Sequence, residues 1–156
     1  MLRAVPPENV HAAVTLIEPL IVLGALTTEL FLKCLICIET GDTPRGHNLR
    51  ELFDQLNAAT RARIQNMWDS GIALRRRKEW DEIERFGLKM PRDLPSALAK
   101  GSNAFERIRY SYEENTEGLH YYLEDLPPLL EGLILEMKPE FEAFRRMPLP
   151  LPAPRH

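Results

Sequence analysis

The longest apolar stretch of the chain runs from Leu20 to Ile38 and predicts a helix in the protein core. Between Leu30 and Ile38 every residue except Lys33 is apolar, and a helix that is apolar on all sides belongs in a core. The stretch is long enough to cross a bilayer, but Glu29 and Lys33 lie in its middle, where charges are costly. The pattern therefore favours a buried helix of a soluble protein over a membrane span.

Proline, glycine and capping residues indicate where the helices begin and end. A first helix is expected after Pro7, and it should end or kink at Pro19 because an internal proline removes a backbone hydrogen bond. The glycines and the proline between 41 and 46 should end the apolar helix. Asn48, with Glu51 three positions later, has the spacing of an N-cap that opens the next helix.

Apolar positions recur at helical spacing in four later stretches of the chain. The first follows a break at Asn57, the second is capped by Asp93, and the third is capped by Ser102. The last begins near Pro127 and should be kinked or shortened by Pro139.

These elements predict an all-α domain, an up-and-down bundle of five to six helices within residues 1–146. A chain of 156 residues with 44% hydrophobic and 28% charged residues suits one globular domain. Leucine and proline alternate in residues 147–156, so this Pro-rich tail should be extended and disordered.

Charge is unevenly distributed along the chain. The net charge of −3 argues against a basic footprint over the whole protein. Between Arg61 and Arg92, however, nine basic residues face five acidic ones, whereas residues 113–142 hold nine acidic residues and one lysine. This section, which contains the basic run 75–78, should include a mobile loop or an exposed helix end. A charge run of this kind is usually a solvated surface, but it can contact phosphates or acidic partners. Trp80 beside it offers a stacking surface.

The two cysteines, Cys34 and Cys37, indicate a reducing compartment, because two thiols do not make a disulfide framework in a chain of this length. The N-terminus also lacks the pattern of a signal peptide, so a cytoplasmic location is expected. The CxxC spacing occurs in redox motifs next to a βαβ pattern, which this sequence lacks. Within an apolar helix these cysteines should be small core residues.

Glu29 and Lys33 are four residues apart and therefore share one helix face, in the favourable order for an ion pair. Their apolar surroundings predict partial burial. The first interpretation is a structural pair that sets the helix register, and the second is one wall of a polar site between helices.

A second candidate cluster follows the same helical spacing. Phe105, Arg109 and Tyr112 fall on one face, next to Tyr110, and Glu113 can reach back toward Arg109. An arginine with two tyrosines and a carboxylate can bind phosphate and stack on a base. The same residues can also form an internal network in which Arg109 pairs with Glu29 or with a helix C-terminus.

His47 follows Gly46 at a helix entrance and is the candidate proton carrier, although it can also simply hydrogen-bond the loop.

The four histidines, His11, His47, His120 and His156, have no zinc-helix spacing, so no metal is expected. The strings GxxxxGKS/T, GxGxxG, GxSxG and HExxH are absent. Nothing therefore supports a kinase, dehydrogenase, serine hydrolase or zinc protease, and no cofactor is expected.

Three segments, in their order and spacing, resemble HEPN-type helical proteins. They are an ExxLK helix at 29–33, a GHxLxxLF helix start at 46–53 and an FxxxRYxYE helix at 105–113. The likeness spans roughly residues 20–115. It implies a helical bundle that often dimerises and that acts on RNA or nucleotides, frequently in bacterial defence or toxin–antitoxin systems.

Many HEPN-type proteins are metal-independent ribonucleases with an arginine followed four to six residues later by a histidine. Counting on from Arg107 and Arg109 meets no histidine at that distance, and His120 lies too far along. The sequence therefore departs from the nuclease members, and catalysis is not expected.

Three hypotheses remain. The first is a module that binds RNA or a nucleotide through Arg109, Tyr110 and Tyr112, with Lys33 and His47 in support. The second is a non-catalytic protein that forms a helical homodimer, in which Glu29, Lys33 and Glu113 belong to a structural polar cluster. The third is a degenerate ribonuclease with His47 as general acid or base and Arg109 stabilising the developing charge.

Overall fold

A computed structural model describes the backbone of residues 7–85, 87, 89–102 and 123–145, and the side chains in the first of these ranges from Val22 onward. The regular elements in these ranges are all helical, without a strand. The predicted all-α helical bundle is therefore confirmed. The predicted tail at 147–156 and the predicted helix after Ser102 lie outside the described residues.

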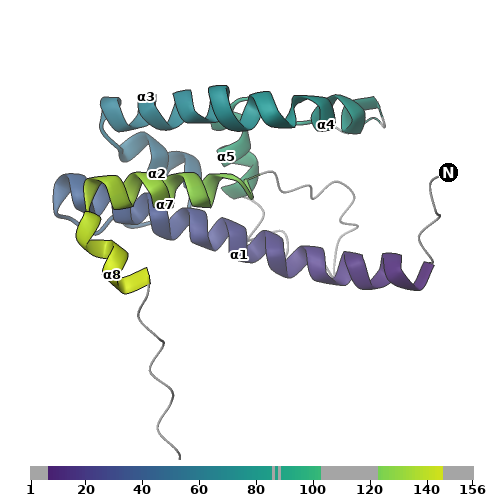
Figure 1. Cartoon of the computed structure of the whole chain (residues 1–156), viewed down its shortest axis with the longest axis horizontal. Helices are drawn as coiled ribbons and strands as arrows, with labels where there is room; N and C mark the ends of the chain where they lie inside the picture. Colours follow the sequence, from purple (N-terminus) through teal and green to yellow (C-terminus); the bar gives the residue numbers. More distant parts are fainter. Residues whose placement is uncertain (1–6, 86, 88, 103–122, 146–156) are drawn as a thin grey trace, which may run out of the picture.

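The bundle is built on one long helix. The elements are, in chain order, α1 (Pro7–Thr40), α2 (Leu49–Gln55), α3 (Ala58–Met67), the π-helical turn η1 (Trp68–Ala73), α4 (Leu74–Arg85), α5 (Leu94–Ser102), α7 (Leu126–Met137), the short 3-10 turn η2 (Pro139–Phe141) and α8 (Glu142–Arg145). Helix α1 packs against α7 and α2, and α2 packs against α5. In Figure 1, α3, η1 and α4 form one continuous helical rod on the other side of α2 and α7 from α1.

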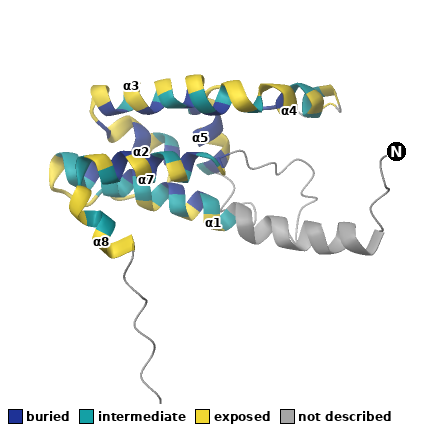
Figure 2. Cartoon of the chain, in the orientation of Figure 1, coloured by how far each residue is buried: buried dark blue, intermediate teal, exposed yellow. Residues whose placement is uncertain are grey.

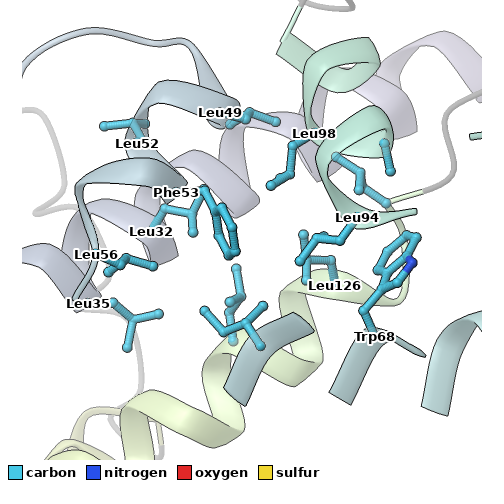
Figure 3. Close-up of a cluster of buried hydrophobic side chains, with 14 of the residues drawn as sticks. Leu32, Leu35, Leu49, Leu52, Phe53, Leu56, Trp68, Leu94, Leu98 and Leu126 are labelled. Atoms are coloured by element: carbon cyan, nitrogen blue, oxygen red, sulfur yellow. The ribbon is translucent and has the colours of Figure 1, made fainter. Parts of the chain in front are cut away.

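The core lies where α1, α2, α5, α7 and the rod meet. Figure 3 shows leucines from these helices converging around Phe53, with Trp68 at one end. Fully buried members of this core include Leu32, Leu35, Leu49, Leu52, Ile64, Leu94, Leu98, Leu126, Leu130 and Leu133. Each such side chain contributes about 1.5–3 kcal/mol when it leaves water, so this cluster is the main source of stability.

Helix α1 continues through Pro19 without a break, so the predicted end of a helix at that position is wrong. A proline removes one donor and crowds the preceding turn, and this can bend a helix without ending it. The longer helix is favoured because its C-terminal half packs against α2 and α7. Among the described residues, no helix is both long enough and apolar enough to cross a membrane.

The buried helix predicted around residue 30 is buried on one side only. Leu32 and Leu35 are inaccessible to solvent, whereas Leu23, Leu26 and Leu30 on the opposite face are 58%, 39% and 55% exposed. Figure 2 shows this mixed burial along α1. The expectation of a helix enclosed on all sides is therefore wrong, because no described element packs on the outer face.

The predicted caps Asn48 and Asp93 are in place, whereas Ser102, which was predicted to cap a following helix, is the last residue of α5. The side chain of Asn48 accepts hydrogen bonds from the backbone N–H groups of Arg50 and Glu51, at 3.0 and 3.2 Å. Asn57 caps α3 through the N–H of Thr60 at 2.8 Å. Asp93 caps α5 through the N–H of Ser96 at 2.8 Å. These side chains satisfy donors that the first turn of a helix leaves free.

The final helix is shortened at Pro139, as predicted. Helix α7 ends at Met137, and after Lys138 the chain forms the short turn η2 and then α8. Pro139 begins η2, where its missing N–H group breaks no helical hydrogen bond.

The basic run 75–78 lies at the start of α4, and most of this helix is exposed. Of the two expectations, the exposed helix end therefore describes the run and the mobile loop does not. Trp80 anchors α4, because its ring stacks on that of Trp68 at a centroid distance of 6.2 Å. Trp80 is only 2% exposed, so the prediction that it offers a stacking surface to a ligand is also wrong. Ile83 of the same helix also packs against the core, so these two residues attach an otherwise polar helix to it.

Candidate functional site

Three polar side chains meet on α1 and on the loop that follows it, and we call them the α1 cluster: Glu29, Lys33 and His47. The Oε1 atom of Glu29 accepts from Lys33 Nζ at 2.8 Å and lies 2.9 Å from Nδ1 of His47. The Glu29–Lys33 pair was predicted from its spacing. The contact with His47 joins residues 18 positions apart, as expected if His47 stands at the rim of a polar cluster.

The loop between α1 and α2 brings His47 back to Glu29. Gly41 and Gly46 have φ angles of 80° and 92°, which favour glycine, and they let the chain reverse. The far end of the loop is held at Asn48, whose side chain caps α2. Ser102 at the end of α5 reinforces this point, because its Oγ accepts the N–H of Leu49 at 2.8 Å. The imidazole is therefore carried on a loop that is fixed at both ends.

Burial differs sharply among the three residues. The side chains of Glu29 and Lys33 are 12% and 20% exposed, whereas that of His47 is 83% exposed. Because an ionised carboxylate only accepts hydrogen bonds, Nδ1 of His47 carries the hydrogen in this contact. The other ring nitrogen, Nε2, is then left for solvent or a ligand.

This arrangement can bind an anion or carry a proton. Lys33 and a protonated His47 supply charge-assisted hydrogen bonds of the kind that phosphate oxygens accept. A neutral His47 held through Nδ1 presents Nε2 as a base, in the manner of a histidine oriented by a carboxylate. The interaction of Glu29 with both partners compensates the charge of this partly buried carboxylate.

The second predicted cluster lies outside the described residues. Arg109, Tyr110, Tyr112 and Glu113 all fall within 103–122, so their predicted meeting with Glu29 and Lys33 remains a prediction.

The two cysteines are free thiols at intermediate burial. Burial, and then the neighbouring Cys37, raise the pKa of the Cys34 thiol, and Cys34 packs against the hydrophobic core. Since the thiolate is the reactive form, Cys34 is a weak nucleophile. Within the described part of the chain, no group of three or more His, Cys, Asp or Glu side chains could hold a metal ion.

Sequence reasoning missed a second polar cluster, formed between α4 and the residues that precede α7. In this α4–α7 cluster, Arg76 donates to Asp125 at 2.8 Å, to Glu79 at 2.7 Å and also to Glu124. Arg75 approaches Asp125 at 3.9 Å. The opposite net charges of the segments around 61–92 and 113–142 were the available signal, because they favour contact between the two.

Comparison of the chain with protein-family models, curated proteins and solved structures finds no match. The likeness to HEPN-type proteins therefore rests on the three sequence segments alone. The helical fold and the α1 cluster are the structural basis for a functional proposal.

Proposed function

We propose that this protein is a HEPN-like module that binds RNA or a nucleotide, with the α1 cluster holding a phosphate group. The observation that carries the proposal is the single Glu29 oxygen bonded by both Lys33 and His47. It leaves a highly exposed imidazole, oriented through Nδ1, beside an ammonium group. The two nitrogen-bearing side chains outnumber the one carboxylate, so a protonated His47 gives the cluster a net positive charge.

The sequence resemblance supplies the rest of the proposed site. Arg109 would add a second phosphate contact, and Tyr110 and Tyr112 would stack on a base. In this proposal the protein is cytoplasmic and belongs to a bacterial defence or toxin–antitoxin setting.

Titration of a fluorescently labelled single-stranded RNA and of ATP tests the proposal. His47→Ala and Lys33→Met should each weaken binding by about ten-fold, because one charge-assisted hydrogen bond is worth about 1.5–3 kcal/mol. Lys138→Met is the matched control, since Lys138 is an exposed lysine outside the α1 cluster, and it should leave the affinity unchanged. Arg109→Ala should weaken binding as well.

Two results would contradict this function. One is an absence of binding of either ligand by the wild-type protein. The other is an equal affinity of wild type, His47→Ala and Lys33→Met for both ligands, which would place any binding elsewhere.

A helical homodimer is the second candidate, and the exposed face of α1 favours it. Leu23, Leu26 and Leu30 are spaced by three and four residues, as at the seam between two packed helices. Leu30→Glu should shift a dimer to monomer in sedimentation equilibrium. Leu74→Glu, at a leucine of α4 that is 66% exposed against 55% for Leu30, should leave the mass unchanged. A monomeric wild type would end this candidate.

Ribonuclease activity is the third candidate, because a histidine oriented by a carboxylate can act as a general base. Incubation of the same RNA with the protein would then yield cleavage products that disappear with His47→Ala. Cleavage that persists in this variant would exclude a catalytic role for His47.

A further inference from the structure

The four residues of the basic run 75–78 in α4 point in two directions, two toward the residues before α7 and two toward solvent. Arg76 turns toward the residues before α7 and is bound by three carboxylates, and Arg75 approaches one of them. Arg77 and Lys78, the other two members of the run, are exposed and form no ion pair with any side chain that the structure describes. Half of the run is therefore structural, and the other half is directed to solvent.

Most of the acidic residues of α4 are already engaged. Glu79 accepts from Arg76 at 2.7 Å. Asp81 and Glu84 each accept from Arg92 at 2.6 Å. Of the carboxylates in α4, Glu82 is left without a partner among the described residues. Arg77, Lys78 and Arg85 form no ion pair with a described side chain. Asp81 nevertheless lies near Arg77 and Arg85, and Glu82 follows Lys78 by one helical turn, so the excess of positive charge on this helix surface is small.

These cations share one surface with an exposed apolar residue. Leu74, Arg77, Lys78 and Arg85 are spaced by three, one and seven positions, which places them on one helix face; we call this set the α4 face. Leu74 is 66% exposed, the largest value among the exposed large apolar side chains of the described residues. The pKa of Asp81, which lies on the same face, is lowered chiefly by the hydrogen bond from Arg92 and further by the nearby charges of Arg77 and Arg85.

The composition of the α4 face distinguishes between two kinds of anionic partner. Proteins that bind single-stranded nucleic acid combine cations with aromatic rings on which bases stack. The tryptophan of α4, Trp80, is buried against Trp68 and cannot serve in this way. The face instead presents an exposed leucine beside three cations, a combination that suits carboxylates flanking an apolar side chain.

We propose that the α4 face is a docking surface for an acidic protein segment, with carboxylates on Arg77, Lys78 and Arg85 and an apolar side chain on Leu74. This surface is separate from the α1 cluster and does not depend on the function proposed for it. The positive charge of the α4 face favours a partner segment with negative charge. Leu74 determines where along that segment an apolar side chain has to lie.

A labelled synthetic peptide of Glu-Glu-Leu repeats serves as the probe, followed by fluorescence anisotropy. The wild-type protein should bind it at millimolar or lower concentration and should not bind the same peptide with glutamine in place of glutamate. The triple variant Arg77→Glu/Lys78→Glu/Arg85→Glu should lose affinity by roughly ten-fold or more. Leu74→Ser should cause a smaller loss, because the charges remain.

A matched triple variant controls for the change in net charge. Arg45→Glu/Lys138→Glu/Arg145→Glu makes the same change away from the α4 face and should leave peptide binding within about two-fold of wild type. Circular dichroism and the melting temperature verify that the variants fold. If the α4 triple variant does not fold, the single variants Arg77→Gln and Lys78→Gln replace it.

The proposal is overturned if wild type does not bind the acidic peptide, or if the two triple variants bind it equally. Polyuridine is titrated in parallel. Binding of polyuridine, but not of the peptide, that is lost in the α4 triple variant would make the face a nucleic-acid surface and would also overturn the proposal.

Discussion

The α1 cluster and the α4–α7 cluster contain the same kinds of charged group but match them in opposite proportions. In the α1 cluster one carboxylate, Glu29, serves two nitrogen-bearing side chains, Lys33 and His47. In the α4–α7 cluster one guanidinium, that of Arg76, serves three carboxylates. The groups in excess are donors in the first case and acceptors in the second.

This difference indicates what each cluster can do. The imidazole of His47 in the α1 cluster faces solvent, so the proposed phosphate would not displace an internal partner there. Arg76 has its guanidinium nitrogens engaged, and its pKa is raised, first by the hydrogen bond to Asp125 and then by that to Glu79. The α4–α7 cluster therefore ties α4 to the start of α7, whereas the α1 cluster leaves the imidazole of His47 exposed to solvent.

The largest expected effect comes from the core beneath the α4–α7 cluster. Trp80→Ala should lower the free energy of unfolding by about 3–5 kcal/mol, because it removes a buried ring that stacks on Trp68. Urea unfolding measures this loss, and Leu74→Ala on the exposed side of α4 should change it by less than about 0.5 kcal/mol. A loss no larger than that of Leu74→Ala would mean that ion pairs, and not packing, hold α4.

A pair of substitutions tests the comparison directly. Arg76→Ala should lower the free energy of unfolding by about 1–2 kcal/mol, because the ion pairs that it removes are partly exposed and so contribute less than buried ones. It should leave RNA affinity unchanged. His47→Ala should weaken RNA binding and cost less than about 0.5 kcal/mol, because His47 is largely exposed. Unfolding and anisotropy are measured on both variants. The reverse pattern, with binding lost at Arg76 and stability lost at His47, would exchange the two roles.

The smallest effect is expected at a carboxylate outside both clusters. Asp93 Oδ1 accepts from the N–H of Ser96 at 2.8 Å and caps α5, so Asp93→Ala should cost about 1 kcal/mol at neutral pH. This bond is the main reason that the pKa of Asp93 is lowered. A lowered pKa means that the carboxylate stabilises the fold above the ordinary aspartate pKa and that this contribution is lost as the pH falls through the folded value.

Urea unfolding of wild type and Asp93→Ala as a function of pH checks this sign. The difference between the two proteins should be constant near neutral pH and should vanish in acid, below the ordinary aspartate range. A difference that grows in acid would contradict the cap. In the α1 cluster and the α4–α7 cluster the carboxylates are bonded by side chains, whereas Asp93 is bonded by a backbone N–H group. The same result would therefore remove this difference between Asp93 and the two clusters.

Local signals predicted much of the fold. Asn48 and Asp93 cap helices at the expected positions, the break expected at Asn57 separates α2 from α3, and Pro139 shortens α7. Each signal acts within about one helical turn, a distance over which spacing determines contact. Pro19 misled the prediction because the local cost of a proline is outweighed by the packing of the rest of α1.

The candidate site was predicted in part. The Glu29–Lys33 pair follows from its spacing of four, and His47 was expected at its rim. The contact of His47 with Glu29 depends on a loop reversal that periodicity alone cannot give. Arg76 lies 48 and 49 positions from Glu124 and Asp125, and only the opposite net charges of the two segments pointed to that contact.

By itself, the sequence determined that the chain is helical, where several helices begin and end, and that Glu29 pairs with Lys33. These features depend on interactions between residues a few positions apart. Only the tertiary structure decided that α1 leaves Leu23, Leu26 and Leu30 exposed, that Trp80 is buried and that His47 meets Glu29. The physical reason is that these outcomes depend on which helix faces pack together, and that packing is set by the sum of many distant contacts.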